Sequence, residues 1–297
     1  MARGVSIGIA FSGLLSVANL AAAQSPSPDV RVKVDALASV QFSEGGSGRL
    51  RLFDLYGRPG TVGLTAQFES GLKAYLSQRL QRPVSGTDRE FVDEVYLEDE
   101  GLWRVGKQVL PFGYRSTFFE SALAVRGETN LILEGIPFVV AVCDAGPGRM
   151  RGVVGRVGSQ SLSVSIAGGQ HFGASASSFG LIRLPEAAPG RGRGYGLVAG
   201  GELIRRIGTY GLKIEVVSAQ QGATVDDRNF TLWDVSMSGR GRNWRWEIGA
   251  TRTNPVRNEI LRLGASFRVD DRTSIEPVIR FRDGRISDGA LQVRFRF

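Results

Sequence analysis

The chain has 297 residues, with 37 Lys and Arg against 29 Asp and Glu, 40 Gly, one Cys and one His. No run of about 20 apolar residues occurs beyond the N-terminus, which excludes a helical membrane bundle. The single Cys143 excludes an internal disulfide framework and a multi-Cys metal site, and the single His171 disfavours His-ligated metals and most His-dependent catalysis.

The first residues predict a secretory signal peptide. After a short, positively charged start, residues 5–20 are apolar with small polar interruptions, and Ala21-Ala22-Ala23 supplies a small-residue cleavage pattern. A retained membrane anchor is the alternative, which the short and weakly apolar run disfavours. With residues 1–23 removed, residues 24–29 form a short extended leader, and residues 30–297 form a single domain.

Much of the remaining chain alternates between apolar and polar residues. Val30 to Phe42 has an apolar residue at every second position, which indicates a β-strand. A longer run, Val62 to Leu80, keeps one parity throughout and is also interpreted as strand, with an amphipathic helix over Leu72–Arg82 as the alternative. Further segments of about ten residues alternate near the C-terminus. These are 244–251, 261–269, 275–282 and 291–297.

Alternation without comparable helical segments predicts an antiparallel all-β fold. A soluble sandwich would bury the apolar parity in a core, whereas a transmembrane β-barrel would face it to lipid and keep the polar parity in a wet lumen. Three features favour the closed transmembrane antiparallel β-barrel. The strands are long, the polar positions are rich in Arg, and aromatic residues lie near strand ends, at Tyr56, Tyr195, Tyr210, Trp244 and Phe297.

The connections between predicted strands give a strand count and an orientation. The count is 14 if residues 111–147 form one long connection, which we favour, and 16 if part of 119–143 supplies a hairpin. Both counts are even, so both termini lie at the periplasmic end. Periplasmic turns are short and outer loops long in bacterial barrels. Asp270-Asp271 is therefore expected to face the periplasm, and Asp283–Ser287 and Phe172–Gly194 the outside.

Three stretches resemble Gram-negative outer-membrane porins of the general and phosphate-selective type. The final strand ends in Phe295 and Phe297, which is similar to the C-terminal signature that the barrel-assembly machinery reads. Residues 149–158 and 161–169 resemble the paired strands that follow the porin constriction loop. A third stretch resembles a porin strand and the turn after it, with Lys in place of the usual Arg at 107; its motif residues are Arg104, Gly106, Lys107, Gln108, Pro111, Phe112 and Gly113.

The resemblance implies a water-filled channel in the outer membrane, commonly a homotrimer, with one long loop folded into the pore. Tyr114–Asp144 occupies the place of that loop, but it is apolar rather than acidic. The resemblance implies outer-membrane lipid and the barrel-assembly machinery as partners. It implies no nucleic acid and names no solute.

Seven arginines near the C-terminus have the parity opposite to the apolar face, so we expect them to line one wall of the lumen. They are Arg245, Arg262, Arg268, Arg280, Arg282, Arg294 and Arg296. The alternative is neutralisation by acidic residues across the lumen, such as Glu69, Glu94, Glu202 and Glu215. The surplus of positive charge favours anions.

The sequence favours no catalytic or metal site. His171 would be the centre of a barrel hydrolase, but the nearby serines lie along its own strand, and a solvated loop histidine is the ordinary alternative. Asp226-Asp227 and Asp270-Asp271 fall at predicted turns, where Asp bonds to the local backbone. We predict a porin that passes small hydrophilic, preferentially anionic solutes by passive diffusion, without cofactor or enzymatic activity. A structural or assembly barrel with a plugged lumen is the alternative.

Overall fold

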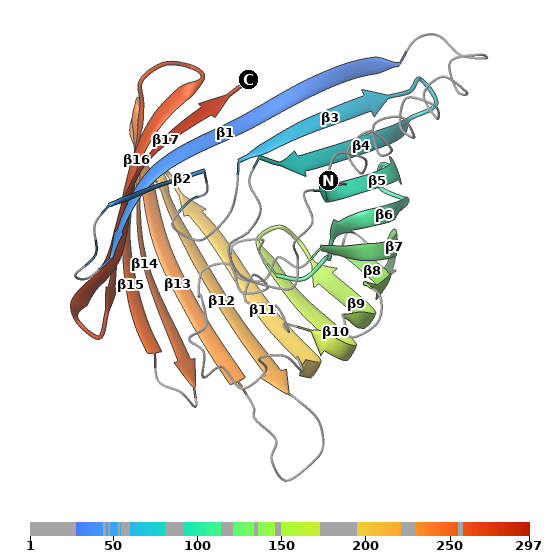
Figure 1. Cartoon of the computed structure of the whole chain (residues 1–297). Coiled ribbons are helices and arrows are strands. Elements are labelled where there is room, and N and C mark those ends of the chain that lie inside the picture. The colour runs from blue at the N-terminus through green and yellow to red at the C-terminus, as the bar shows by residue number, and fades with distance from the viewer. Residues whose placement is uncertain are drawn as a thin grey trace, which may run out of the picture.

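The computed structural model describes residues 28–43, 46, 48–52, 54, 60–80, 92–113, 121–133, 136–145, 150–172, 195–220, 230–254 and 258–297. These residues form one antiparallel sheet (Figure 1). No helix in this part of the chain is long and apolar enough to cross a membrane. The strands are β1 (Asp29–Ser43), β2 (Arg49–Arg51), β3 (Thr61–Gln67), β4 (Leu72–Arg79), β5 (Val92–Asp99), β6 (Trp103–Val109), β7 (Ser121–Leu133), β8 (Ile136–Asp144), β9 (Arg151–Gly158), β10 (Leu162–Phe172), β11 (Tyr195–Ile207), β12 (Tyr210–Gln220), β13 (Phe230–Arg240), β14 (Trp244–Asn254), β15 (Asn258–Arg268), β16 (Thr273–Arg282) and β17 (Arg285–Arg296).

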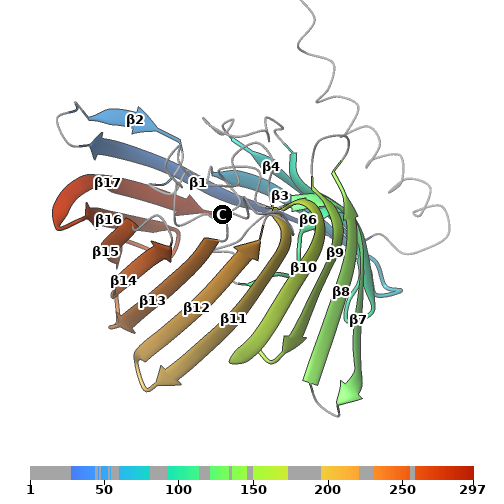
Figure 2. The ribbon, with the colours of Figure 1, turned by 90° about the horizontal axis from the view of Figure 1, so that it is seen from below.

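The sheet closes on itself into a barrel of 16 strands. From β3 to β17 each strand pairs with the next one in sequence, and β1 joins the two ends. Residues Asp35–Ser43 of β1 pair with β17, and Asp29–Asp35 pair with β3. The short β2 lies beside β1 over Ser39–Gln41 and adds no strand to the ring. Figure 2 shows the strands following one another around this ring, which confirms the prediction of a closed antiparallel barrel.

The count of 16 arises because residues 121–144 form the β-hairpin β7–β8 rather than part of one long connection. Ala124 pairs with Cys143, and Val125 with Val142. Val125 and Val142 are exposed on the outward face, which explains why this stretch is apolar where a constriction loop would be acidic. The alternative in which part of residues 119–143 forms a hairpin is therefore confirmed, and the barrel has 16 strands instead of the favoured 14.

The alternating run from Val62 to Leu80 is also a hairpin, β3–β4, and neither one long strand nor a helix over Leu72–Arg82. Leu64 pairs with Leu76, and Ala66 with Ala74. Because these partners are an even number of residues apart, the outward positions keep the same parity on both sides of the turn. Periodicity alone cannot distinguish such a hairpin from a single long strand.

Side-chain burial is inverted relative to a soluble protein. On β10, Val164 and Ile166 point outward and are 56% and 54% exposed, whereas Ser163 and Ser165 point inward and are 2% and 1% exposed. On many other strands, large apolar residues are likewise exposed outside, and Ser, Thr, Gln, Glu, Asp and Arg side chains are buried inside. A soluble sandwich would have the opposite arrangement, so the pattern is that of a barrel in lipid.

The two ends of the barrel differ in the length of their connections. We name the end that holds Phe297 the C-terminal rim; there Phe297 and Val34 exchange two backbone hydrogen bonds of 2.9 Å. Connections at this rim are short, such as Gly208-Thr209 between β11 and β12, whereas those at the opposite rim extend up to residues 173–194. Short turns at one end and long loops at the other are typical of outer-membrane barrels.

An aromatic group covers the outward face at the C-terminal rim. Tyr210 and Trp246 have ring centroids 6.3 Å apart, and Trp244 pairs with Phe267 on the neighbouring strand. Trp244 and Phe267 are about half exposed. Aromatic side chains at this height are typical of a membrane interface. The side chains of Tyr56 and Tyr195 lie outside the described residues.

Candidate functional site

A cavity of about 650 Å³ lies in the lumen at the C-terminal rim, between strands β12 to β17 and their turns. Basic residues outnumber acidic ones in its lining. The basic residues are Lys213, Arg240, Arg242, Arg245, Arg262, Arg268, Arg272, Arg294 and Arg296, and the acidic residues are Asp54, Glu247, Asp270, Asp271 and Glu276. We name the inward face of β13–β17 the arginine wall. The seven arginines singled out in the sequence all occupy inward positions on β14–β17.

Two of these arginines are buried in ion pairs that belong to the wall itself. Arg262, 3% exposed, donates to Asp234 at 2.7 Å and also to the Thr251 hydroxyl. Arg280 pairs with Asp288 through a 2.7 Å hydrogen bond from its Nη2. A buried, bidentate arginine of this kind holds strands together, and its charge is largely offset where it lies.

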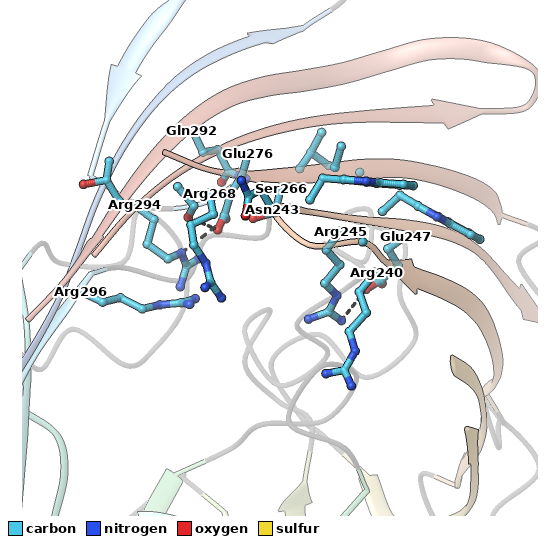
Figure 3. A pocket seen from close by; sticks show the side chains of 18 of the residues that line it. Arg240, Asn243, Arg245, Glu247, Ser266, Arg268, Glu276, Gln292, Arg294 and Arg296 are labelled. Carbon is cyan, nitrogen blue, oxygen red and sulfur yellow. Dashed lines mark hydrogen bonds and ion pairs between the residues drawn. The ribbon is translucent and has the colours of Figure 1, made fainter. Parts of the chain in front are cut away.

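The arginines nearer the rim have weaker or shared partners. Arg294 lies between Asp35, at 3.2 Å, and Glu276, at 3.4 Å, and Arg296 reaches the same Asp35 carboxylate at 3.7 Å. Arg245 is 3.6 Å from Glu247, and its side chain is 57% exposed. Figure 3 shows Arg268, Arg294 and Arg296 together on one side of the cavity and Arg240 and Arg245 on the other.

Among the described residues, Arg240, Arg242 and Arg268 have no carboxylate within ion-pair distance. Arg240 and Arg242 were missed in the sequence analysis. Arg240 shares the inward parity of Asp234 and Ser236 on β13, so continuing the alternation along that strand would have found it. Arg282 lies nearer the opposite rim, and its Nε is buried without a hydrogen-bond partner in the described part of the chain.

The inward face of β4–β7, which we name the paired wall, carries cations that all contact carboxylates. Lys73 and Arg104 both bind Glu98, Arg79 binds Asp93 at 2.7 Å, and Arg126 binds Glu128. The Arg104 guanidinium also lies 4.1 Å from the centroid of the Tyr96 ring, a favourable cation–π arrangement. Charge on this wall is therefore neutralised side chain by side chain.

The porin-like motif forms β6 of the paired wall and the turn that follows. Gly106 has φ of 132°, and a Cβ there would collide with the backbone of β5, so no other residue fits. Gln108 is fully buried and donates to the Ala124 carbonyl at 3.0 Å. Lys107 lies on the outward face, where its Nζ donates to the Val92 carbonyl at 2.7 Å.

After β6 the chain turns across the lumen to the opposite wall. Pro111 begins this inward segment, which ends at Gly113 with φ of 55°. The Gly113 N–H donates to the Ser165 hydroxyl of β10 at 3.2 Å, and a Cβ at Gly113 would collide with the Glu215 carboxylate of β12. Phe112 lies against Gly200 of β11. Residues 110–113 therefore narrow the lumen, whereas most of Tyr114–Asp144 is barrel wall.

An apolar belt lies inside the barrel nearer the opposite rim, around the inward segment. It contains large side chains from Phe112 and Phe172 and many small ones, and all of its members are buried. The belt consists of Leu110, Phe112, Ala122, Ala124, Ala141, Cys143, Met150, Val154, Ala167, Phe172, Val198, Val217, Ala219, Leu232 and Ile260. The lumen thus has an apolar belt around the inward segment and a charged cavity at the C-terminal rim.

Of the remaining candidates, the structure describes Asp270, which bonds to its own turn. Asp270 Oδ1 accepts hydrogen bonds from the backbone N–H groups of Arg272 and Thr273, both at 2.7 Å, as turn aspartates do. Asp226-Asp227 and the His171 side chain lie outside the described residues. No group of three or more His, Cys, Asp or Glu that could hold a metal ion occurs among the residues described.

Phe295 and Phe297, the residues of the assembly signature, lie on the outward face where the barrel closes. Phe295 pairs with Ala36 of β1, and the Phe297 ring lies 5.6 Å from the Arg272 guanidinium. Both rings are partly exposed. Their positions leave the side chains accessible on the outer surface of the barrel.

Several solved structures share this fold. The outer membrane channel DcaP of Acinetobacter baumannii superposes with a TM-score of 0.65 at 11% identity, over 91% of this chain and 97% of that chain. An anion-selective porin from Comamonas acidovorans gives 0.62 at 12% identity, over 91% and 100%. The trimer form of OmpT, an outer membrane protein of Vibrio cholerae, gives 0.57 at 10% identity, over 91% and 99%.

No protein-family model matches the chain, and no curated protein matches its sequence. The structural likeness extends over nearly the whole barrel in each case, so the porin resemblance suggested by the three short stretches is confirmed at the level of the fold. The chain folds as a porin-like outer-membrane β-barrel.

Proposed function

We propose that this barrel is an outer-membrane porin that passes small hydrophilic solutes by passive diffusion and prefers anions. The observation that carries the proposal is the cavity at the C-terminal rim, where nine basic side chains face five acidic ones. Arg240, Arg242 and Arg268 have no carboxylate partner among the described residues, so the surplus is not cancelled locally.

The mechanism is electrostatic selection in a confined space. Fixed positive charge raises the local concentration of anions and repels cations, and guanidinium groups bind carboxylates and phosphates through paired N–H donors. Salt at about 0.15 M screens such charge beyond about 8 Å, so selection depends on how closely a solute must pass the arginines of the cavity. The mechanism needs no cofactor and no chemical step, so the protein is proposed to be a channel and not an enzyme.

Orientation and assembly form part of the same proposal. In this proposal the C-terminal rim, with its short turns, faces the periplasm, and residues 173–194 face the outside of the cell. Cleavage after Ala23 would release the chain for assembly, Phe297 would be read by the barrel-assembly machinery, and the mature barrel would form a homotrimer. A trimer form among the similar structures supports the last point. Protease added to intact cells should cut within 173–194 and spare Asp270-Asp271.

A planar-bilayer recording with a KCl gradient tests the function directly. An anion-preferring porin gives a steady conductance and a reversal potential on the chloride side of zero, by an amount that grows as the salt is diluted. A conductance with a reversal potential at zero or on the potassium side would contradict the anion preference. The proposal that the barrel is a porin would still stand. Absence of conductance would contradict the porin itself.

A structural barrel with a plugged lumen is the second candidate, favoured by the inward segment and the apolar belt. Phe112 reaches the wall at Gly200, and Gly113 reaches the wall at Ser165 and Glu215. If these contacts close the lumen, the bilayer recording will show no current for the native protein. A variant that shortens Phe112, such as Phe112→Ala, would then open one, whereas in an open porin it would only raise an existing conductance.

A further inference from the structure

The register of the β13–β14 hairpin places two arginines directly opposite each other. Arg240, the last residue of β13, pairs with Arg245 near the start of β14. Side chains at directly opposed positions have Cβ atoms about 4.5–5.5 Å apart, and like charges there destabilise the sheet. Arg245 has one carboxylate within reach, Glu247 at 3.6 Å, and Arg240 has none among the described residues.

A third arginine borders this pair. Arg242 lies in the three-residue turn of the same hairpin and lines the same cavity. The backbone N–H of Arg268 donates to the Asn243 carbonyl at 2.8 Å, which ties the end of β15 to that turn. Ser266, which pairs with Arg245, also lines the cavity and supplies a neutral hydroxyl donor beside the guanidinium groups.

Two acidic side chains elsewhere in the cavity have partners of their own. Asp270 Oδ1 accepts hydrogen bonds from the backbone N–H groups of Arg272 and Thr273, which belong to the same turn. Glu276 accepts from the Ser274 hydroxyl at 2.8 Å and contacts Arg294. In the described part of the chain, Glu247 is therefore the one carboxylate within ion-pair distance of the arginines of the β13–β14 turn.

We propose that the β13–β14 turn is a binding site for a divalent tetrahedral oxyanion, of the size and charge of sulfate or hydrogen phosphate, held by Arg240, Arg242 and Arg245. One such anion accepts paired N–H donors from two guanidinium groups and replaces their mutual repulsion with two charge-assisted interactions. The site stabilises the C-terminal rim, and it does so whether or not the barrel conducts, so the inference is independent of the proposed function.

Thermal unfolding of the detergent-solubilised barrel, in sodium sulfate against sodium chloride of equal ionic strength, tests the site. Sulfate at about ten times its dissociation constant should raise the unfolding temperature by about 3 °C or more. Sulfate also stabilises proteins through exclusion from their surfaces, so a charge-matched control is needed. Arg205→Gln with Arg252→Gln removes two arginines from the outward face of β11 and β14, and this variant should retain the full sulfate response.

The double variant Arg240→Gln with Arg245→Gln separates the site from a general salt effect. In chloride it should unfold at a higher temperature than the native protein, because the opposed charges are gone, and it should lose the sulfate response that the control retains. A sulfate response equal in all three proteins would overturn the proposal. So would a site variant that unfolds earlier than the native protein in chloride. Calorimetric titration with sodium sulfate supplies a second readout, with binding at least about tenfold weaker in the site variant than in the control.

Discussion

The arginine wall and the paired wall line the same lumen and differ in how their cations are partnered. On the paired wall, Lys73, Arg79, Arg104 and Arg126 each contact a carboxylate of the same wall. On the arginine wall, the distances within ion pairs are longer toward the C-terminal rim than in the buried bridges. At that rim several guanidinium groups have no carboxylate within ion-pair distance in the described part of the chain. In the proposed porin, the contribution of an arginine to ion selectivity would therefore depend on where it lies along the wall, and a count of arginines would not give the selectivity.

The partners of an arginine also decide what its removal would do. Arg262 and Arg280 lie in buried bridges, so replacing them would disturb the wall more than the field in the lumen. Arg240, Arg245 and Arg268 face the cavity with few or no carboxylates, so replacing them would change the field and disturb the wall little. The following experiments test this division, beginning with the largest expected effect.

Strand β1 closes the barrel between β17 and β3. The first experiment changes Phe297, which lies at this closure. Phe297→Asp keeps the backbone bonds to Val34 but places a charge on the outward face and removes the terminal aromatic side chain. We expect it to abolish most outer-membrane accumulation, whereas Arg296→Gln, at the neighbouring inward position, should assemble nearly normally. Immunoblots of outer-membrane fractions measure both. Equal levels of the two variants would contradict the assignment of Phe297 as the assembly signal.

The second experiment removes the partner of a buried arginine. Asp234→Asn removes the carboxylate that the buried Arg262 guanidinium contacts on β13, which should cost roughly 3–5 kcal/mol of unfolding free energy. Glu247→Gln breaks an exposed pair on the same wall and should cost no more than about 1 kcal/mol. Urea unfolding in lipid vesicles measures both variants. A similar loss of unfolding free energy in the two variants would mean that buried and exposed ion pairs of the arginine wall do not differ in their contribution to stability.

The third experiment compares the fields of the two walls. Arg240→Gln, Arg245→Gln and Arg268→Gln together remove charge from the cavity, and we expect the chloride-to-potassium permeability ratio to fall roughly twofold or more, with a larger change at low salt. Removing a bound pair from the paired wall, Arg104→Gln with Glu98→Gln, should leave the ratio unchanged because the net charge of that wall is unchanged. Reversal potentials in KCl gradients measure both, and equal shifts would refute the comparison.

Strand identity and facing were predictable because alternation is a local property. The parity of residues 244–251, 261–269, 275–282 and 291–297 places apolar side chains outside and the seven arginines of these segments inside, and the structure has this arrangement. The positions of the hairpin turns were harder to predict from the sequence. Val62–Leu80 keeps its parity through the turn at residues 68–71, so the pattern contains no mark of the break. The turn between β16 and β17 was expected at Asp283–Ser287 but is the two-residue Asp283-Gly284, with φ of 50° and 78°; Asp-Gly is a strong hairpin signal that would have located it.

Partners of the arginines were not predictable, because they depend on register between strands. The sequence analysis considered carboxylates across the lumen, such as Glu202, which in the structure binds Arg156 at 3.2 Å. Arg262 instead meets Asp234, which is two strands away in the same wall, and Arg294 meets Asp35 across the seam between β17 and β1. A pattern of alternation fixes the face of each side chain but not its height on the barrel.

The smallest expected effect concerns Asp270, an acidic residue of the cavity lining that serves its own turn. The backbone N–H groups of Arg272 and Thr273 donate to its carboxylate and lower the pKa of Asp270 below its ordinary value of 3.8. Because the pKa is lower in the folded state, the turn gains stability that is present above pH 3.8 and is lost as the pH falls through the folded pKa. The carboxylate is fully exposed, so the effect should be confined to the turn.

Hydrogen exchange at the Arg272 and Thr273 amides can detect this local loss. In the native protein, protection of both amides, corrected for intrinsic exchange, should fall as the pH is lowered from 6 toward 3, while strand amides stay protected. Asp270→Asn keeps an acceptor oxygen but cannot titrate, so its protection should be lower and independent of pH, and Asp270→Ala should remove the protection at every pH. If the native protein and Asp270→Asn follow the same pH curve, the carboxylate of Asp270 is not committed to the turn. The Asp270 carboxylate would then be available to pair with a cation of the arginine wall. That wall would have one more acidic partner, and the difference in charge pairing between the two walls would be smaller.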